Sequence, residues 1–114
     1  MIAKTLNLQI TQGRDFSRTL TFYNDYDAGT KLDISGYTFK AQIREQQDQA
    51  STLLATFTMT VTTATSTVVM ELTDSDTADL PPGIAWWDLV VTVGGNSQSW
   101  LGGQAIIKGG PTEV

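Results

Sequence analysis

The chain has 114 residues, of which 40% are hydrophobic, and a formal net charge of −5. It contains neither cysteine nor histidine, which excludes disulfides, thiolate metal sites and the commonest general base and metal ligand. This length suits one domain. We expect a single domain over residues 1–108, followed by a loose C-terminal tail over residues 109–114.

The sequence shows no sign of a membrane or secretory segment. Its longest apolar stretches fall well short of the roughly 20 residues that cross a bilayer, and Met1–Lys4 leads into alternating residues instead of a signal-type apolar block. The lack of cysteine agrees with a reducing compartment. We therefore expect a protein that is made and assembled in a cytoplasm and has no membrane partner.

Charged residues are unevenly distributed along the chain. Residues 1–44 hold six basic and four acidic side chains (net +2), whereas residues 45–114 hold one basic and eight acidic side chains (net −7). Nucleic-acid binding needs a continuous basic surface, so nucleic acid is not an expected partner. The asymmetry either favours head-to-tail contact between copies or leaves two differently charged, solvated faces.

Alternation of apolar and polar residues predicts three strands in the N-terminal part of the chain. They are expected over Lys4–Ile10, Asp15–Tyr23 and Tyr37–Glu45, with turn-forming loops between the second and the third. In the second strand Arg18 shares a face with apolar residues. We place it near a strand end or a sheet edge, because an unpaired buried charge is costly.

The rest of the chain adds further strands and one short helix. Residues Leu53–Thr62 and Thr67–Leu72 should form a hairpin, and the last strand should run from about Gln98 to Lys108. N-capping residues and early carboxylates predict one helical turn near residues 74–79. About seven short antiparallel strands with one helical turn predict an all-β fold, a two-sheet β-sandwich, with a small barrel as the alternative.

The clearest strand follows Pro81-Pro82-Gly83, where two prolines and a glycine mark a tight turn. Odd-numbered residues from Ala85 to Val93 are apolar and form one predicted core face, while even-numbered residues point to the other side. Trp87 should therefore lie in the core, and Trp86 should point outward.

No motif for catalysis or metal binding stands out. Carboxylates cluster at residues 25–27 and 74–79, but the first group lacks the terminal glutamate of a calcium loop and the second fits helix capping. Asp88 has no accompanying nucleophile or base, so we expect a structural ion pair between Asp88 and Arg44 or Lys40. We expect no catalytic residue, no metal and no cofactor.

Aromatic side chains are the better functional candidates. The candidate interface or ligand contacts are Trp86, Trp100 and Tyr26. Trp86 lies on the predicted outward face, Trp100 has small and polar neighbours, and Tyr26 lies in a polar loop. Tryptophan can stack on sugar faces or anchor a protein interface. The alternative is that loops cover the outer face of the sheet and bury Trp86.

An ordered series of turns and strand segments carries a resemblance to a known group. It comprises Gln12-Gly13-x-Asp15-Phe16, Leu20-Thr21-Phe22, Leu32-Asp33-Ile34-Ser35-Gly36-Tyr37, Ile43-Arg44, Leu80-Pro81-Pro82-Gly83, Trp87-Asp88-Leu89 and Leu101-x-Gly103. In this order the segments resemble small structural proteins of tailed phages and prophages. The chain is also similar to the N-terminal domain of siphophage baseplate upper proteins, although Trp86-Trp87 stands where a less bulky residue and a tyrosine are usual.

The resemblance implies an immunoglobulin-like β-sandwich that serves as a tail, baseplate, neck or capsid-surface component. Such a protein is not an enzyme. It would pack against other virion proteins and copies of itself, so that weak contacts sum through avidity, and it would reside in the virion after assembly in the host cytoplasm. The alternative function is a glycan-binding module for host attachment through Trp86 and Trp100.

Overall fold

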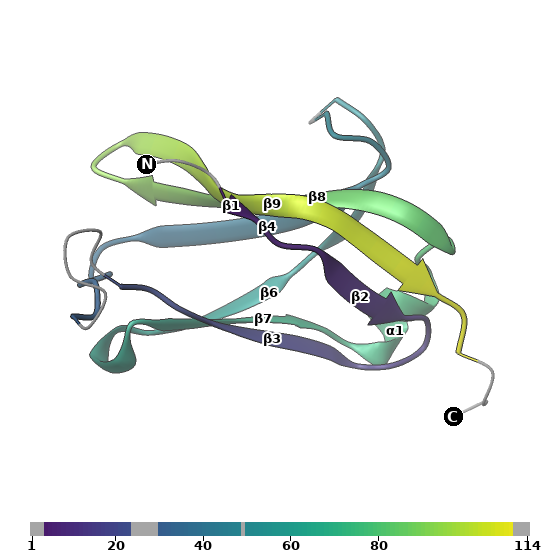
Figure 1. Cartoon of the computed structure of the whole chain (residues 1–114), viewed down its shortest axis with the longest axis horizontal. Helices are drawn as coiled ribbons and strands as arrows, with labels where there is room; N and C mark the ends of the chain where they lie inside the picture. Colours follow the sequence, from purple (N-terminus) through teal and green to yellow (C-terminus); the bar gives the residue numbers. More distant parts are fainter. Residues whose placement is uncertain (1–3, 24–29, 49, 111–114) are drawn as a thin grey trace.

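The computed structural model describes residues 4–23, 30–48 and 50–110, which form two packed β-sheets (Figure 1). Sheet A contains β1 (Lys4–Thr5), β2 (Leu8–Thr11), β4 (Thr38–Arg44), β5 (Leu53–Thr56), β8 (Gly83–Val93) and β9 (Asn96–Lys108). Sheet B contains β3 (Phe16–Thr21), β6 (Thr58–Thr62) and β7 (Thr67–Leu72). The predicted all-β sandwich is thereby confirmed.

The strands follow the order β1-β9-β8-β4-β5 in sheet A, where β2 also pairs with β9, and β3-β7-β6 in sheet B. A 3₁₀ turn (Thr63–Thr65) joins β6 to β7, and the short helix α1 (Asp74–Ala78) joins β7 to β8. The predicted helical turn is confirmed. No helix in the described part of the chain is long and apolar enough to span a bilayer.

Burial along β8 follows the predicted period of two from Ala85 to Val91, whereas Val93, predicted for the core face, is exposed at the end of the strand. The odd-numbered residues Ala85, Trp87, Leu89 and Val91 are buried, and the residues between them are exposed or half-buried. The strand starts at Gly83, whose φ of 124° lies in the region that favours glycine, as expected after two prolines. The inner face of β8 therefore forms the centre of the core.

The N-terminal strand differs from its prediction. The expected strand Lys4–Ile10 is divided into β1 and β2, and both run parallel to β9. Side chains alternate with the same period in parallel and antiparallel strands, so the pattern alone did not determine the direction. The sandwich therefore combines antiparallel pairs with a parallel N-terminal edge.

The expected strand Leu53–Thr62 is also divided, between the two sheets. Its first part, β5, pairs with β4 in sheet A, and its second part, β6, pairs with β7 in sheet B. Phe57, between them, is buried, and its N–H donates a 3.0 Å hydrogen bond to the Ala41 carbonyl. The chain therefore crosses from one sheet to the other at Phe57 and closes one side of the sandwich.

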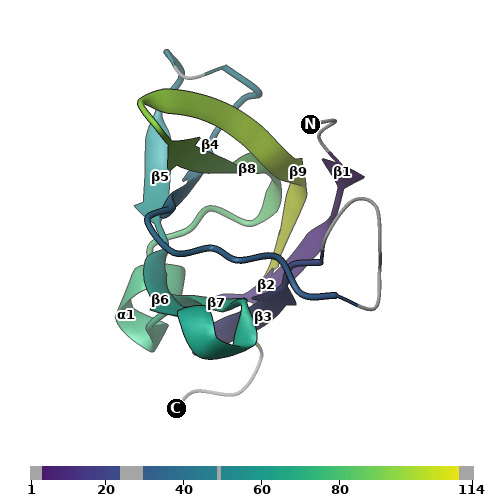
Figure 2. The same ribbon diagram turned by 90° about the vertical axis from the view of Figure 1, so that its left-hand side faces the viewer.

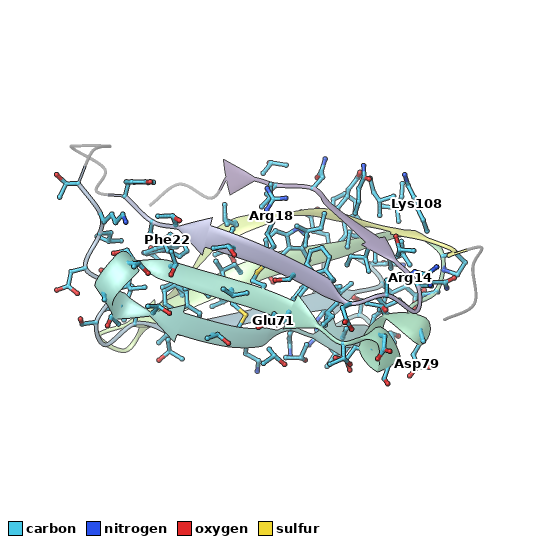
Figure 3. The ribbon with its side chains drawn as sticks, turned by 90° about the horizontal axis from the view of Figure 1, so that it is seen from below. Arg14, Arg18, Phe22, Glu71, Asp79 and Lys108 are labelled. Atoms are coloured by element: carbon cyan, nitrogen blue, oxygen red, sulfur yellow. The ribbon has the colours of Figure 1, made fainter. Side chains whose placement is uncertain are left out.

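Arg18 lies on β3, which is an edge strand of sheet B (Figure 3). It pairs in register with the buried Met70 of β7, yet it is exposed. The prediction of a solvated edge position is confirmed. A charge on the inner side of an edge strand also discourages uncontrolled pairing with other strands.

The turn between β2 and β3 fastens α1 to the end of the sandwich. Thr77 Oγ1 donates a 2.7 Å hydrogen bond to the Arg14 carbonyl, and the N–H of Asp74 donates a 2.8 Å bond to Asp15 Oδ1. Gln12 Nε2 donates to the Leu80 carbonyl at 2.6 Å. Two segments of the resemblance, around Gln12 and around Leu80, thus meet in space.

Candidate functional site

The outer face of sheet A carries an open trough of about 750 Å³, which we call the Trp86 trough. It is lined by β4, β8 and β9, by the N-terminal segment and by the loop between β4 and β5. This loop rises above sheet A in Figure 1 and forms one wall. Of the aromatic candidates, Trp86 lines this trough.

Trp86 lies in the middle of a row that crosses three strands. Its register neighbours are Arg44 on β4 and Gln104 on β9. The side chain is half-buried and points away from the core, as the alternation predicted. Its role as an interface or ligand contact stays a prediction.

The next row along the sheet contains Gln42, Asp88 and Gly102. Asp88 is exposed, and its Oδ2 accepts a 3.1 Å hydrogen bond from Ser99 Oγ. Gly102 has no side chain to cover Asp88; a Cβ there would lie 3.4 Å from the Asp88 Cβ. The carboxylate is therefore open to the trough.

The expected ion pair of Asp88 with Arg44 or Lys40 is absent among these three described residues. Arg44 donates from Nη1 to the Ser51 carbonyl at 2.8 Å and from Nη2 to Gln42 Oε1 at 3.3 Å. In register Arg44 pairs with Trp86, and Lys40 pairs with Val90, so neither lies directly opposite Asp88. Arg44 instead holds the loop between β4 and β5 at the wall of the trough.

The N-terminal segment forms the opposite margin and is fixed by close contacts. The N–H of Leu6 donates to the Gly102 carbonyl at 2.9 Å, and the N–H of Gln104 donates to Asn7 Oδ1 at 3.1 Å. A Cβ on Gly103 would lie 2.6 Å from the Leu6 carbonyl oxygen. The glycine pair inside β9 therefore allows this close backbone approach.

Trp100 is buried, which corrects its prediction as an available contact residue. A bulge causes this placement: Leu89 pairs with Leu101 but Val90 pairs with Ser99, so Trp100 is the extra residue on β9. Its ring meets those of Phe22 and Tyr37 with centroids 5.5 and 5.8 Å apart.

Tyr26, the third aromatic candidate, lies outside the described residues. The same is true of residues 111–114 of the expected tail. Within the described ranges, no three acidic side chains gather closely enough to hold a metal ion. The trough with Trp86 therefore remains as the candidate site.

Comparison with known proteins identifies a family that the chain matches. A family model described as an LtfC-like, beta-sandwich domain matches residues 3–109. No curated protein matches the chain. The family fits the expected class of phage structural proteins, whereas the specific similarity to baseplate upper proteins stays a prediction.

Proposed function

The chain belongs to the LtfC-like β-sandwich domain family, and on this basis we propose that it is a non-enzymatic structural component of a tailed-phage virion. In this function the domain packs against other virion proteins and against copies of itself. Repetition in a symmetric particle would let individually weak contacts act together. The immunoglobulin-like description and a station in the tail or baseplate belong to the same proposal.

Exposed apolar side chains at one end of the sandwich indicate where it would pack against other proteins. We call this region the hairpin end: it contains the β6–β7 connection, the β8–β9 turn and the segment that follows β3 (Figures 1 and 2). Tyr23, Val61 and Val93 are 48%, 39% and 40% exposed there. They are three of the five large hydrophobic side chains that are exposed within the described residues, which makes this end suitable for a protein contact.

An aromatic cluster supports the hairpin end from inside. Phe22 stacks on Phe39 with ring centroids 5.6 Å apart, and it meets Trp100 edge-on at 5.5 Å. Tyr37 contacts both Phe39 and Trp100. A pre-ordered support lowers the conformational entropy that a contact at this end would cost.

Sedimentation velocity over a concentration series, with and without purified particles, tests the packing proposal. The wild-type chain should self-associate or co-sediment with particles. The double variant Val61→Lys with Val93→Lys should do neither, because the two lysines place charges in the contact. Thr60→Lys, on the outer face of sheet B, is the matched control and should behave as wild type. A wild-type chain that stays monomeric and does not bind particles contradicts the proposal.

A further inference from the structure

We propose that the Trp86 trough binds a neutral saccharide. This function goes beyond packing through the hairpin end, because the trough lies on the outer face of sheet A. A contact at the end of the sandwich leaves that face accessible (Figure 2). The same domain is therefore able to pack and to bind a ligand at once.

Trp86 provides the aromatic surface that saccharide binding requires. The C–H groups on one side of a sugar ring form an apolar face, and an indole ring matches it in size and shape. Trp86 is half-buried within a row of strand residues, so its ring is held by the sheet and still keeps accessible surface. Trp87 and Trp100 are buried, so Trp86 alone of the three tryptophans is in a position to stack.

Amide groups supply the hydrogen bonds. Five amide side chains line the trough: Asn7, Gln42, Gln46, Gln47 and Gln104. Gln42 already bonds Arg44 and Thr56, and Asn7 Oδ1 accepts from the Gln104 N–H. The other three amide groups offer both donors and acceptors, which match sugar hydroxyl groups that also donate and accept. Thr5 and Ser99 add hydroxyl groups to the same lining.

Asp88 is positioned to accept hydrogen bonds from a ligand. The carboxylate accepts from Ser99, and an ionised carboxylate has capacity for about three further bonds. Gly102, its register partner on β9, has no side chain to cover the carboxylate. A carboxylate on the floor of the trough favours a ligand rich in hydroxyl donors.

The charge of the lining disfavours anionic ligands. Arg44 is the one cationic side chain, and Asp48 and Asp88 are the anionic ones, so the lining carries a net charge of −1. A phosphate, an acidic peptide or an acidic sugar would need the opposite sign. Arg44 is also engaged with Ser51 and Gln42. The lining therefore favours a neutral ligand over an anionic one.

The size of the trough suits a short oligosaccharide. Its volume of about 750 Å³ falls within the range of small-ligand sites, roughly 300–1,000 Å³. Its open form would admit one segment of a longer polysaccharide. Ten of the sixteen lining residues are polar and five of these carry amide groups, which supports a saccharide; a peptide partner is an outcome that the experiment distinguishes.

Tryptophan fluorescence measures binding directly. The probes are chitotriose, maltotriose and galactose- and rhamnose-containing trisaccharides, each titrated to about 10 mM, which covers weak affinities. Binding should shift the emission of the accessible Trp86 and protect it from acrylamide quenching. Trp86→Ala should remove the effect, and Asp88→Asn should weaken binding about tenfold by replacing a charged acceptor.

The controls separate this site from the packing function. Thr60→Ala, on the other sheet, should bind as wild type, and Val93→Lys should bind sugar while losing particle association. Failure of every trisaccharide to bind, or binding that survives in Trp86→Ala, overturns the saccharide proposal. If phage particles protect Trp86 from quenching and no sugar does, the trough binds a protein partner. This outcome also overturns the saccharide proposal, but it leaves the packing function intact.

Discussion

The indole Nε1 of Trp87 donates a 2.8 Å hydrogen bond to the main-chain oxygen of Leu6. This contact ties the N-terminal segment to the buried centre of sheet A, over a separation of 81 residues in the sequence. The segment is one margin of the Trp86 trough, so a core residue also positions part of the candidate site.

Trp87→Phe should loosen the N-terminal segment. Phenylalanine lacks the donor and leaves a small void, and we expect a loss of about 2–4 kcal/mol in the free energy of unfolding. Hydrogen exchange at the Leu6 amide, which donates to Gly102, should accelerate more than exchange in sheet B. Trp86→Phe is the control, and equal Leu6 protection in wild type and Trp87→Phe would show that the contact does not anchor the segment.

Gly103→Ala should destabilise the same margin by a different route. The new Cβ would lie 2.6 Å from the Leu6 oxygen and 2.7 Å from Asn7 Oδ1, so the segment must move. We expect a cost of about 1–3 kcal/mol, typical of overpacking. Gly109→Ala is the matched control because its nearest contact would be an ordinary 3.5 Å. Equal urea midpoints for the two variants would contradict the close approach.

Truncation of a side chain should lower the free energy of unfolding strongly in the core and hardly at all on the outer face of sheet B. Leu89 is fully buried, so Leu89→Ala should cost about 2–5 kcal/mol. Phe39→Ala should fall in the same range. Thr60 is exposed on β6, and Thr60→Ala should stay within about 0.5 kcal/mol of wild type in chemical denaturation. A large effect at Thr60 would mean that this face is covered.

Sequence reasoning succeeded where period-two alternation was unbroken. It placed Trp87 inside and Trp86 outside, and it located the capped helical turn at 74–79. Thr73 and Asp76 form the reciprocal capping bonds of that turn. These features depend on local residues only, which is why a single sequence was sufficient.

The features that the sequence alone did not predict correctly depend on how strands pair and on which sheet they join. Trp100 entered the core through a one-residue bulge, which strict alternation does not reveal. Phe57 marks a change of sheet within an apparently continuous strand. The Asp88 pairing failed because strand register placed Gln42 opposite it. The adjacent glycines at 102 and 103 were the available signal for the close approach of the N-terminal segment.

The pKa of Asp33 should lie below the ordinary value of an aspartate. The backbone N–H of Ser35 donates to its Oδ1 at 3.0 Å, and this bond, followed by that of the Ser35 hydroxyl, lowers the pKa of Asp33. A depressed folded-state pKa contributes stability above the unfolded pKa, and this contribution is lost as pH falls through the folded value. NMR titration should show the depressed pKa, and Asp33→Asn should remove that part of the acid dependence of stability. An undisplaced pKa would contradict the turn geometry.

Quantitative mass spectrometry of density-gradient-purified phage particles tests the central claim most directly. A structural component should co-purify with the particles at a constant ratio to the other virion proteins through successive gradients, and the Val61→Lys with Val93→Lys variant should be depleted from them. A chain that is abundant in the infected-cell lysate but absent from purified particles would contradict the assignment as a virion protein.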